Sequence, residues 1–218
     1  MDIKVDKNTV IVFDLDDTLY NELDFLISAF KDISKRIDKF NSEQVFSIML
    51  SLYRNNENVF EFLNNNYSIK KHDLIEIYRN HYPTIKLNPH VRNFIDELKN
   101  KKINVALLTD GRSITQRNKI SSLGLENVFD YISISEEIGF KKPSSKGFQL
   151  IENFFKKKKY YYIADNLEKD FIAPKKRGWY TICILDNGKN IHYPNVSELI
   201  VEKKPNSYVF SFNELKII

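Results

Sequence analysis

Residues 10–20 read VIVFDLDDTLY, an apolar run that ends in three carboxylates within four positions. The continuous apolar residues predict a buried parallel strand, so that Asp14 and Asp16 emerge at its carboxyl end. In open α/β sheets ligands bind at this edge, and carboxylates crowded there repel one another unless a cation or a shared proton relieves them. We therefore interpret Asp14 and Asp16 as a pair of carboxylates that serve Mg²⁺ binding and acid/base chemistry. The alternative is a strand followed by an acidic turn.

The composition is that of a soluble globular protein. Of the 218 residues, 42% are apolar and 28% are charged, and the net charge is only +4. No apolar stretch is long enough to span a bilayer, and residues 1–8 lack the apolar core of a signal peptide. The lysine run at residues 156–159 is better explained as a solvated turn than as a nucleic-acid or membrane patch. We expect a cytoplasmic protein with no nucleic-acid or membrane partner, in which the single cysteine, Cys183, is a small buried hydrophobe.

The sequence pattern changes its period after the opening strand. Apolar residues between Leu23 and Phe40 recur at three- and four-residue spacing, which predicts a long amphipathic helix. Shorter helical patterns separated by asparagine-rich turns follow, and no strand pattern interrupts them. We predict a small all-helical unit over residues 20–85, inserted into a core formed by residues 1–19 and 86–218.

Helical and strand patterns alternate from residue 88 onward. Asn88 and Pro89 are typical of a helix N-cap and first turn, and Gly124 is typical of a helix end. Short apolar runs predict strands at residues 103–108, 131–134, 160–164 and 179–185, with an edge strand near 208–210. Such alternation implies a parallel sheet covered on both faces. The predicted fold class is α/β, a Rossmann-like parallel sheet with a small all-helical domain inserted after the first strand.

Three later segments place polar residues where the predicted strands end. Thr109 and Asp110 offer a hydroxyl and backbone N–H groups that suit phosphate oxygens, although an ordinary turn uses the same residues. Lys142 lies in a loop before a helix, where a cation would offset charge on a phosphoryl group; most lysines are merely exposed. Asp165 ends a strand and can ligate a hard cation. Asp170 either joins that site or stabilises a helix N-terminus.

These segments resemble the four motifs of the haloacid dehalogenase superfamily of phosphohydrolases. The most specific match is Asp14-Leu15-Asp16-Asp17-Thr18, which fits the pattern Asp-x-Asp-x-Thr after an apolar strand. The other matches are Thr109, then Lys142 before a proline, then Asp165 with Asp170, where Ala164 replaces the usual glycine. The resemblance covers the whole chain apart from the helical insertion and the tail. The insertion corresponds in position to the superfamily's C1 cap.

The resemblance implies a two-step displacement through a covalent aspartyl phosphate. Asp14 would attack phosphorus as the nucleophile. Asp16 would protonate the leaving alcohol and then deprotonate the attacking water, with neighbouring negative charge bringing its pKa near the working pH. The implied reaction is that of a phosphatase acting on a small phosphorylated metabolite, such as a sugar or organic-acid monophosphate, beneath a closing cap.

The resemblance also implies the ligands of this chemistry. The Mg²⁺ ligands would be the Asp14 carboxylate, the Asp16 backbone carbonyl and Asp165, with Asp170 behind them. Thr109, Asp110 and Lys142 would bind the phosphoryl oxygens. Asp17 has no assigned chemical role.

Several alternatives remain open at this point. Asp16 favours a phosphatase over a dehalogenase, which does not need that acid/base group, and no lysine of the insertion is singled out as the Schiff-base residue of a phosphonate hydrolase. A phosphosugar mutase uses the same core residues. A catalytically silent member that binds a phosphorylated ligand or a protein is the alternative from another class. The motifs do not identify the substrate alcohol, and the oligomeric state cannot be inferred from them.

Overall fold

The strand that carries the Asp-x-Asp motif, β2 (Thr9–Phe13), is buried along its whole length in the centre of a parallel sheet. It pairs with a strand on each side, so that Phe13 lies opposite Leu107 on one neighbour and Ile163 on the other. The computed structural model describes residues 1–192 and 203–218. The buried apolar run therefore forms the strand that its sequence predicts.

The sheet contains six parallel strands among the described residues. In spatial order they are β4 (Tyr131–Ile134), β3 (Asn104–Thr109), β2, β5 (Lys159–Ala164), β6 (Tyr180–Ile184) and β7 (Ser207–Val209). The edge strand expected near residues 208–210 is confirmed as β7. Because the chain adds strands first on one side of β2 and then on the other, the sheet has its switch point there, where ligands bind in such sheets.

A second, two-stranded sheet joins the chain ends and pairs β1 (Asp2–Ile3) with β8 (Lys216–Ile217). The motif strand is therefore the second strand of the chain and not the first. Strands of two residues show no alternation or apolar run, so the sequence pattern could not reveal them.

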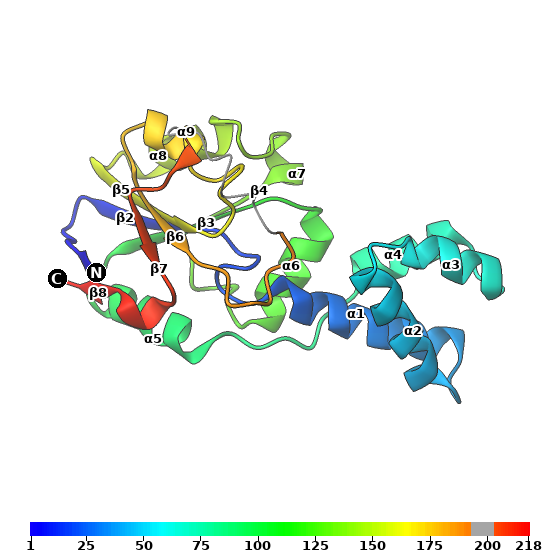
Figure 1. Ribbon diagram of the computed structural model, residues 1–218. Coiled ribbons are helices and arrows are strands. Elements are labelled where there is room, and N and C mark those ends of the chain that lie inside the picture. The colour runs from blue at the N-terminus through cyan, green and yellow to red at the C-terminus, as the bar shows by residue number, and fades with distance from the viewer. Residues whose placement is uncertain (193–202) are drawn as a thin grey trace.

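Helices cover both faces of the main sheet (Figure 1). They are α5 (Pro89–Asn100), α6 (Ser113–Ser122), α7 (Ser135–Ile138), α8 (Lys146–Phe155), α9 (Ile172–Lys176) and the 3₁₀ helix η3 (Phe212–Glu214). Alternate residues of β2 point to opposite faces, so Phe13 packs with Phe94 of α5 while Val12 belongs to the apolar cluster of the other face, with Phe148 of α8. The predicted α/β class, with helices on both faces, is confirmed.

The insertion after β2 folds into four helices with an apolar cluster of their own. They are α1 (Glu22–Ile37), α2 (Ser42–Arg54), α3 (Val59–Asn66) and α4 (Lys71–Asn80). Ile33, Met49, Leu63 and Leu74 are fully buried in this cluster. Figure 1 shows the unit projecting from the sheet along α1. No helix among the described residues has the length and apolar character needed to cross a membrane.

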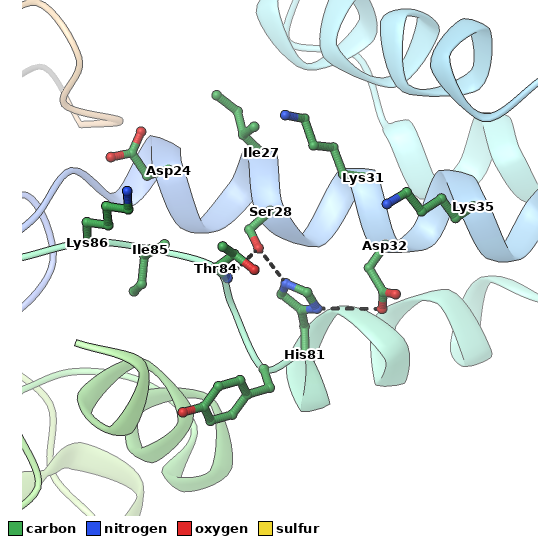
Figure 2. A pocket seen from close by; sticks show the side chains of 11 residues that line it. Asp24, Ile27, Ser28, Lys31, Asp32, Lys35, His81, Thr84, Ile85 and Lys86 are labelled. Atoms are coloured by element: carbon green, nitrogen blue, oxygen red, sulfur yellow. Dashed lines mark hydrogen bonds and ion pairs between the residues drawn. The ribbon is translucent and has the colours of Figure 1, made fainter. Parts of the chain in front are cut away.

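The segment that returns from the insertion is pinned to α1 by polar contacts (Figure 2). His81, the C-cap of α4, has its Nε2 2.8 Å from Ser28 Oγ and its Nδ1 3.5 Å from Asp32. The backbone N–H of Thr84 donates to the same Ser28 oxygen at 2.8 Å. A cavity of about 670 Å³ lies beside these contacts, bordered by Lys86 and Lys31. This cluster connects the outgoing and returning chain between the core and the insertion.

Candidate active site

The predicted site residues converge at the carboxyl ends of three neighbouring strands. Asp14 follows β2, Thr109 ends β3 and Asp165 follows β5. Together with Asp16 and Asp110 they line a cavity of about 130 Å³. The parallel sheet thus brings together groups that lie between about 55 and 150 positions apart in the sequence.

Asp14 is buried beside a buried cation. Lys142 Nζ lies 2.8 Å from an Asp14 oxygen and 2.7 Å from Asp170, and it donates to the Tyr162 hydroxyl at 3.0 Å. Burial raises the pKa of Asp14 to about 6 even though Lys142 opposes the shift. Burial alone would lower the pKa of Lys142, but the Asp14 and Asp170 carboxylates raise it well above its usual range. Lys142 is therefore a fixed positive charge next to the predicted nucleophile.

Three carboxylates form a cluster suited to a hard cation. Oxygens of Asp14, Asp165 and Asp170 lie within 4.8 Å of one another, and all three residues are buried. Burial, followed by the charges of Asp170 and Asp14, raises the pKa of Asp165 well above its usual range. Carboxylate oxygens are preferred ligands of Mg²⁺, and the repulsion among them disappears when a divalent cation binds.

Asp170 occupies a supporting place in this cluster. One of its oxygens accepts from Lys142, and the other accepts from the backbone N–H of Asn166 at 3.0 Å. Its side chain is fully buried, and α9 begins only at Ile172. Of the two readings of Asp170, the structure therefore favours membership of the site over a position in the first turn of a helix. Among the described residues, the hydrogen bonds that the Asp165 carboxylate accepts are long, 3.2 Å from Thr18 and 3.4 Å from Asn190.

Asp16 belongs to a separate network on the other side of the cavity. It accepts from Lys119 Nζ at 2.7 Å, from the Tyr20 hydroxyl at 2.5 Å and from Gln116 Nε2 at 2.9 Å. Burial acts to raise the pKa of Asp16, but Lys119 and the other donors outweigh it and lower the pKa below its ordinary value. The expectation that neighbouring negative charge brings this pKa upward is therefore wrong for the protein without substrate, because a cation sits against the carboxylate.

The groups predicted to bind phosphate differ in what they can offer. The Thr109 oxygen accepts from Gln116 Nε2 at 2.6 Å, which leaves its hydroxyl hydrogen available to a phosphate oxygen. The Asp110 carboxylate accepts from the backbone N–H of Lys142 at 3.2 Å and lies 3.7 Å from Lys169. A carboxylate cannot donate to phosphate, so only the backbone N–H of Asp110 could serve that purpose. The Asp110 side chain instead holds the loop that carries Lys142.

Several residues of this site were not predicted from the sequence. Gln116 and Lys119 lie one turn apart on α6, and both are almost fully buried. Tyr162 lies within β5, and its hydroxyl accepts from Lys142 and donates to Asp170 at 3.4 Å. Glu22, the first residue of α1, and Lys169 also line the cavity. Their three-residue spacing places Gln116 and Lys119 on one helix face. No apolar pattern shows that this face is buried.

The fold and the site together define the class of protein. A parallel sheet carries a buried aspartate, a fixed lysine and a carboxylate cluster at its switch point. The family model for haloacid dehalogenase-like hydrolases matches residues 11–184, about four fifths of the chain. The chain belongs to this family.

Two curated relatives and one solved structure are similar over more than half of the chain. A glyceraldehyde 3-phosphate phosphatase of Methanocaldococcus jannaschii is 27% identical over 198 residues, which cover 80% of this chain and 84% of that protein. A phosphoserine phosphatase of Thermus thermophilus is 29% identical over 121 residues, 55% of this chain and 47% of that protein. A magnesium-bound HAD-hydrolase of Bacillus subtilis has a similar structure, with a TM-score of 0.63 at 22% identity, over 94% of this chain and 95% of that one.

Proposed function

We propose that this protein is a Mg²⁺-dependent phosphatase that hydrolyses a small phosphate ester through an aspartyl phosphate on Asp14. The observation that carries the proposal is the buried Asp14 carboxylate 2.8 Å from Lys142, in a cavity shared with Thr109 and Asp165. The similarity to relatives named as phosphatases of glyceraldehyde 3-phosphate and phosphoserine supports a small phosphate ester as the substrate.

The chemistry follows from what the side chains can do. An Asp14 oxygen attacks phosphorus, the bond from phosphorus to the ester oxygen breaks, and the alcohol leaves with a proton from Asp16. Water then attacks the aspartyl phosphate, Asp16 takes its proton, and inorganic phosphate leaves while Asp14 is regenerated. Lys142 and the Thr109 hydroxyl stabilise the charge on the phosphoryl oxygens. A bound phosphate dianion raises the pKa of Asp16 through like-charge repulsion, which favours the acid form that the first step needs.

The donor set fits Mg²⁺. Asp14 and Asp165 would hold the ion with the Asp16 backbone carbonyl, and Asp170 would orient this group from behind. When bound, Mg²⁺ supplies positive charge that draws the phosphoryl group toward the nucleophile. All ligands would be oxygens, as this ion requires.

We further propose that the helical insertion, residues 20–85, acts as a cap over a core of residues 1–19 and 86–218. The insertion has its own apolar cluster and meets the core through α4 and α6, where Thr115 donates to the Arg79 carbonyl at 2.8 Å. A cap that closes over the cavity excludes water from the phosphoryl transfer and restricts the substrate to small esters.

The proposal is tested by phosphate release from a panel of small phosphate esters with and without Mg²⁺. We expect release by the native protein only with Mg²⁺, and a loss of at least about a thousandfold in Asp14→Asn because the amide cannot act as the nucleophile. Asp96→Asn is the matched control, since Asp96 is exposed on α5. Release that persists in Asp14→Asn would refute the proposed nucleophile. Isomerised ester without free phosphate would identify a mutase instead.

A further inference from the structure

Gln116, a residue of α6 that the proposed chemistry does not use, connects two groups of the site. It is only 1% exposed and lies behind the cavity, which it does not line. Its Nε2 donates to the Asp16 carboxylate at 2.9 Å and to the Thr109 hydroxyl oxygen at 2.6 Å. A carboxamide nitrogen carries two hydrogens, so these two bonds use both of them. One amide group therefore links the proposed acid/base residue to the hydroxyl proposed to bind phosphate.

The chemistry of Asp16 decides which end of the amide faces these groups. Asp16 also accepts from Lys119 Nζ at 2.7 Å, and an ionised carboxylate can only accept hydrogen bonds. The NH₂ end of Gln116 must therefore point toward Asp16, and the same nitrogen meets Thr109. A hydroxyl oxygen that accepts from an amide keeps its own hydrogen free to donate. Gln116 thus leaves the Thr109 hydroxyl, which lines the cavity, as a donor for a phosphoryl oxygen.

The surroundings of Gln116 hold its side chain in place. The loop after β3 passes close to it, because a Cβ placed on Gly111 would lie 2.9 Å from the Cδ atom of Gln116. The neighbouring residue of α6, Thr115, donates to the Arg79 carbonyl at 2.8 Å and fixes the helix against the chain that returns from the insertion. The carboxamide is therefore packed between the loop and its own helix, and its two hydrogen bonds keep both acceptors in a fixed relation.

Resting on the proposed function, we infer that Gln116 is a positioning residue for the transfer of the phosphoryl group. It keeps the Thr109 hydroxyl oriented as a hydrogen-bond donor to the phosphoryl oxygens, and it fixes the Asp16 carboxylate that exchanges a proton with the leaving alcohol. Without the amide, the Thr109 hydroxyl can turn toward a competing acceptor, and Asp16 loses one of its donors. Both losses slow the reaction although Gln116 acts from behind the cavity.

The test compares Gln116→Met with the native protein on two kinds of ester. Methionine has a similar size but cannot donate a hydrogen bond. The esters are the alkyl phosphate of the panel that the native protein hydrolyses best and p-nitrophenyl phosphate, whose weakly basic leaving group needs little protonation by Asp16. We expect kcat/KM to fall by about a hundredfold for the alkyl ester, which needs both groups, and by about tenfold for the aryl ester, which needs Thr109 alone.

A second substitution distinguishes positioning from packing. In a Thr109→Val background, Gln116→Met should lower kcat/KM for the aryl ester by no more than about threefold, because the hydroxyl that Gln116 orients is gone. Gln149→Met is the matched control, since Gln149 is half-buried on α8, donates to the Ser145 hydroxyl at 3.3 Å and does not line the cavity. The control should leave the hydrolysis of both esters unchanged.

Equal losses for both esters, or the same loss with and without the Thr109 hydroxyl, would show that Gln116 only packs the site. Either outcome would overturn the inference while the proposed function stands. If Gln116→Met fails to fold, Gln116→Glu takes its place. Its carboxylate fills the same space, repels Asp16 and accepts the Thr109 hydrogen, so it should change the ratio between the esters in the same direction. Absence of hydrolysis of every ester by the native protein would contradict the proposed function itself.

Discussion

Two buried lysines each contact two carboxylates of the site. Lys142 lies between Asp14 and Asp170, and Lys119 lies between Asp16 and Glu22. Each lysine offsets part of the cost of burying two carboxylates. The proposed nucleophile, Asp14, and the proposed acid/base residue, Asp16, therefore pair with different cations although they are two positions apart in the sequence.

Replacement of Lys119 should destabilise the protein strongly. In Lys119→Met, Asp16 and Glu22 lose their buried cation, so we expect the free energy of unfolding to fall by about 3 kcal/mol or more near pH 8. Without Lys119 the folded-state pKa of each acid rises, so the loss should shrink as the pH falls and the acids become neutral. Urea unfolding at several pH values measures both effects.

Lys99→Met is the control for this substitution. Lys99 pairs with Asp130 at 2.9 Å, but both side chains are exposed by 30% or more. Its loss should cost less than about 1 kcal/mol. Equal effects of the two substitutions would mean that the Lys119 contacts contribute no more than a surface ion pair.

At the residue scale, the sequence revealed only the site groups that form part of a local pattern. Asp14 and Asp16 stand directly after a buried strand, and their place in the structure agrees with that pattern. Lys119 could not be predicted, because a lysine in a helix is exposed by default and its contact with Asp16 joins residues about one hundred positions apart. The roles assigned to Asp14, Asp16 and Thr109 remain predictions until they are measured.

At the scale of elements, the strands of the main sheet were predictable because most of their residues are apolar and stand in short runs. The helix α7 was missed because its four residues are too short for a period of 3.6 to show. The helix α9 is also short, and Pro174 lies at its third residue, where a missing N–H does no harm. Short helices next to the loops of the site therefore cannot be predicted from the spacing of apolar residues alone.

The contact between α1 and the returning segment should depend on pH through His81. Burial lowers the pKa of His81 from its ordinary value of 6.5, although Asp32 acts in the opposite direction. The unfolded chain therefore takes up a proton before the folded one, so stability contributed by neutral His81 is present above about pH 6.5 and is lost as the pH falls. In His81→Gln we expect a loss of about 1 kcal/mol near pH 7.5 that diminishes near pH 5, measured by urea unfolding.

His72→Gln serves as the comparison, because His72 is exposed on the same helix. It should alter neither the stability nor its dependence on pH. If His81→Gln lost the same free energy at both pH values, the imidazole would pack between α1 and the returning segment without responding to protonation.

At the scale of the whole molecule, the sheet assembles a cluster of three carboxylates against a single buried cation, Lys142. Asp14, Asp165 and Asp170 come from segments separated by about 150 residues and meet only in the folded state. Their mutual repulsion opposes folding, and a cation that binds them stabilises the folded state. The motif predicts that carboxylates gather here, but their degree of burial and the raised pKa values of Asp14 and Asp165 depend on packing that no short pattern contains.

Mg²⁺ should therefore raise the thermal unfolding midpoint, and more so at higher pH. The folded-state pKa of Asp14 is about 6 against an ordinary 3.8, so without metal this group stabilises the fold at low pH and that contribution is lost as the pH rises toward 6. Mg²⁺ must displace these protons, so its affinity should increase over the same range. At about one hundred times its Kd the ion adds about 2.7 kcal/mol, or roughly 5–10 °C for a chain of this size. Asp165→Asn should abolish the shift, whereas Asp96→Asn should keep it. A shift of equal size at about pH 5 and pH 8, or one that survives in Asp165→Asn, would place the ion elsewhere.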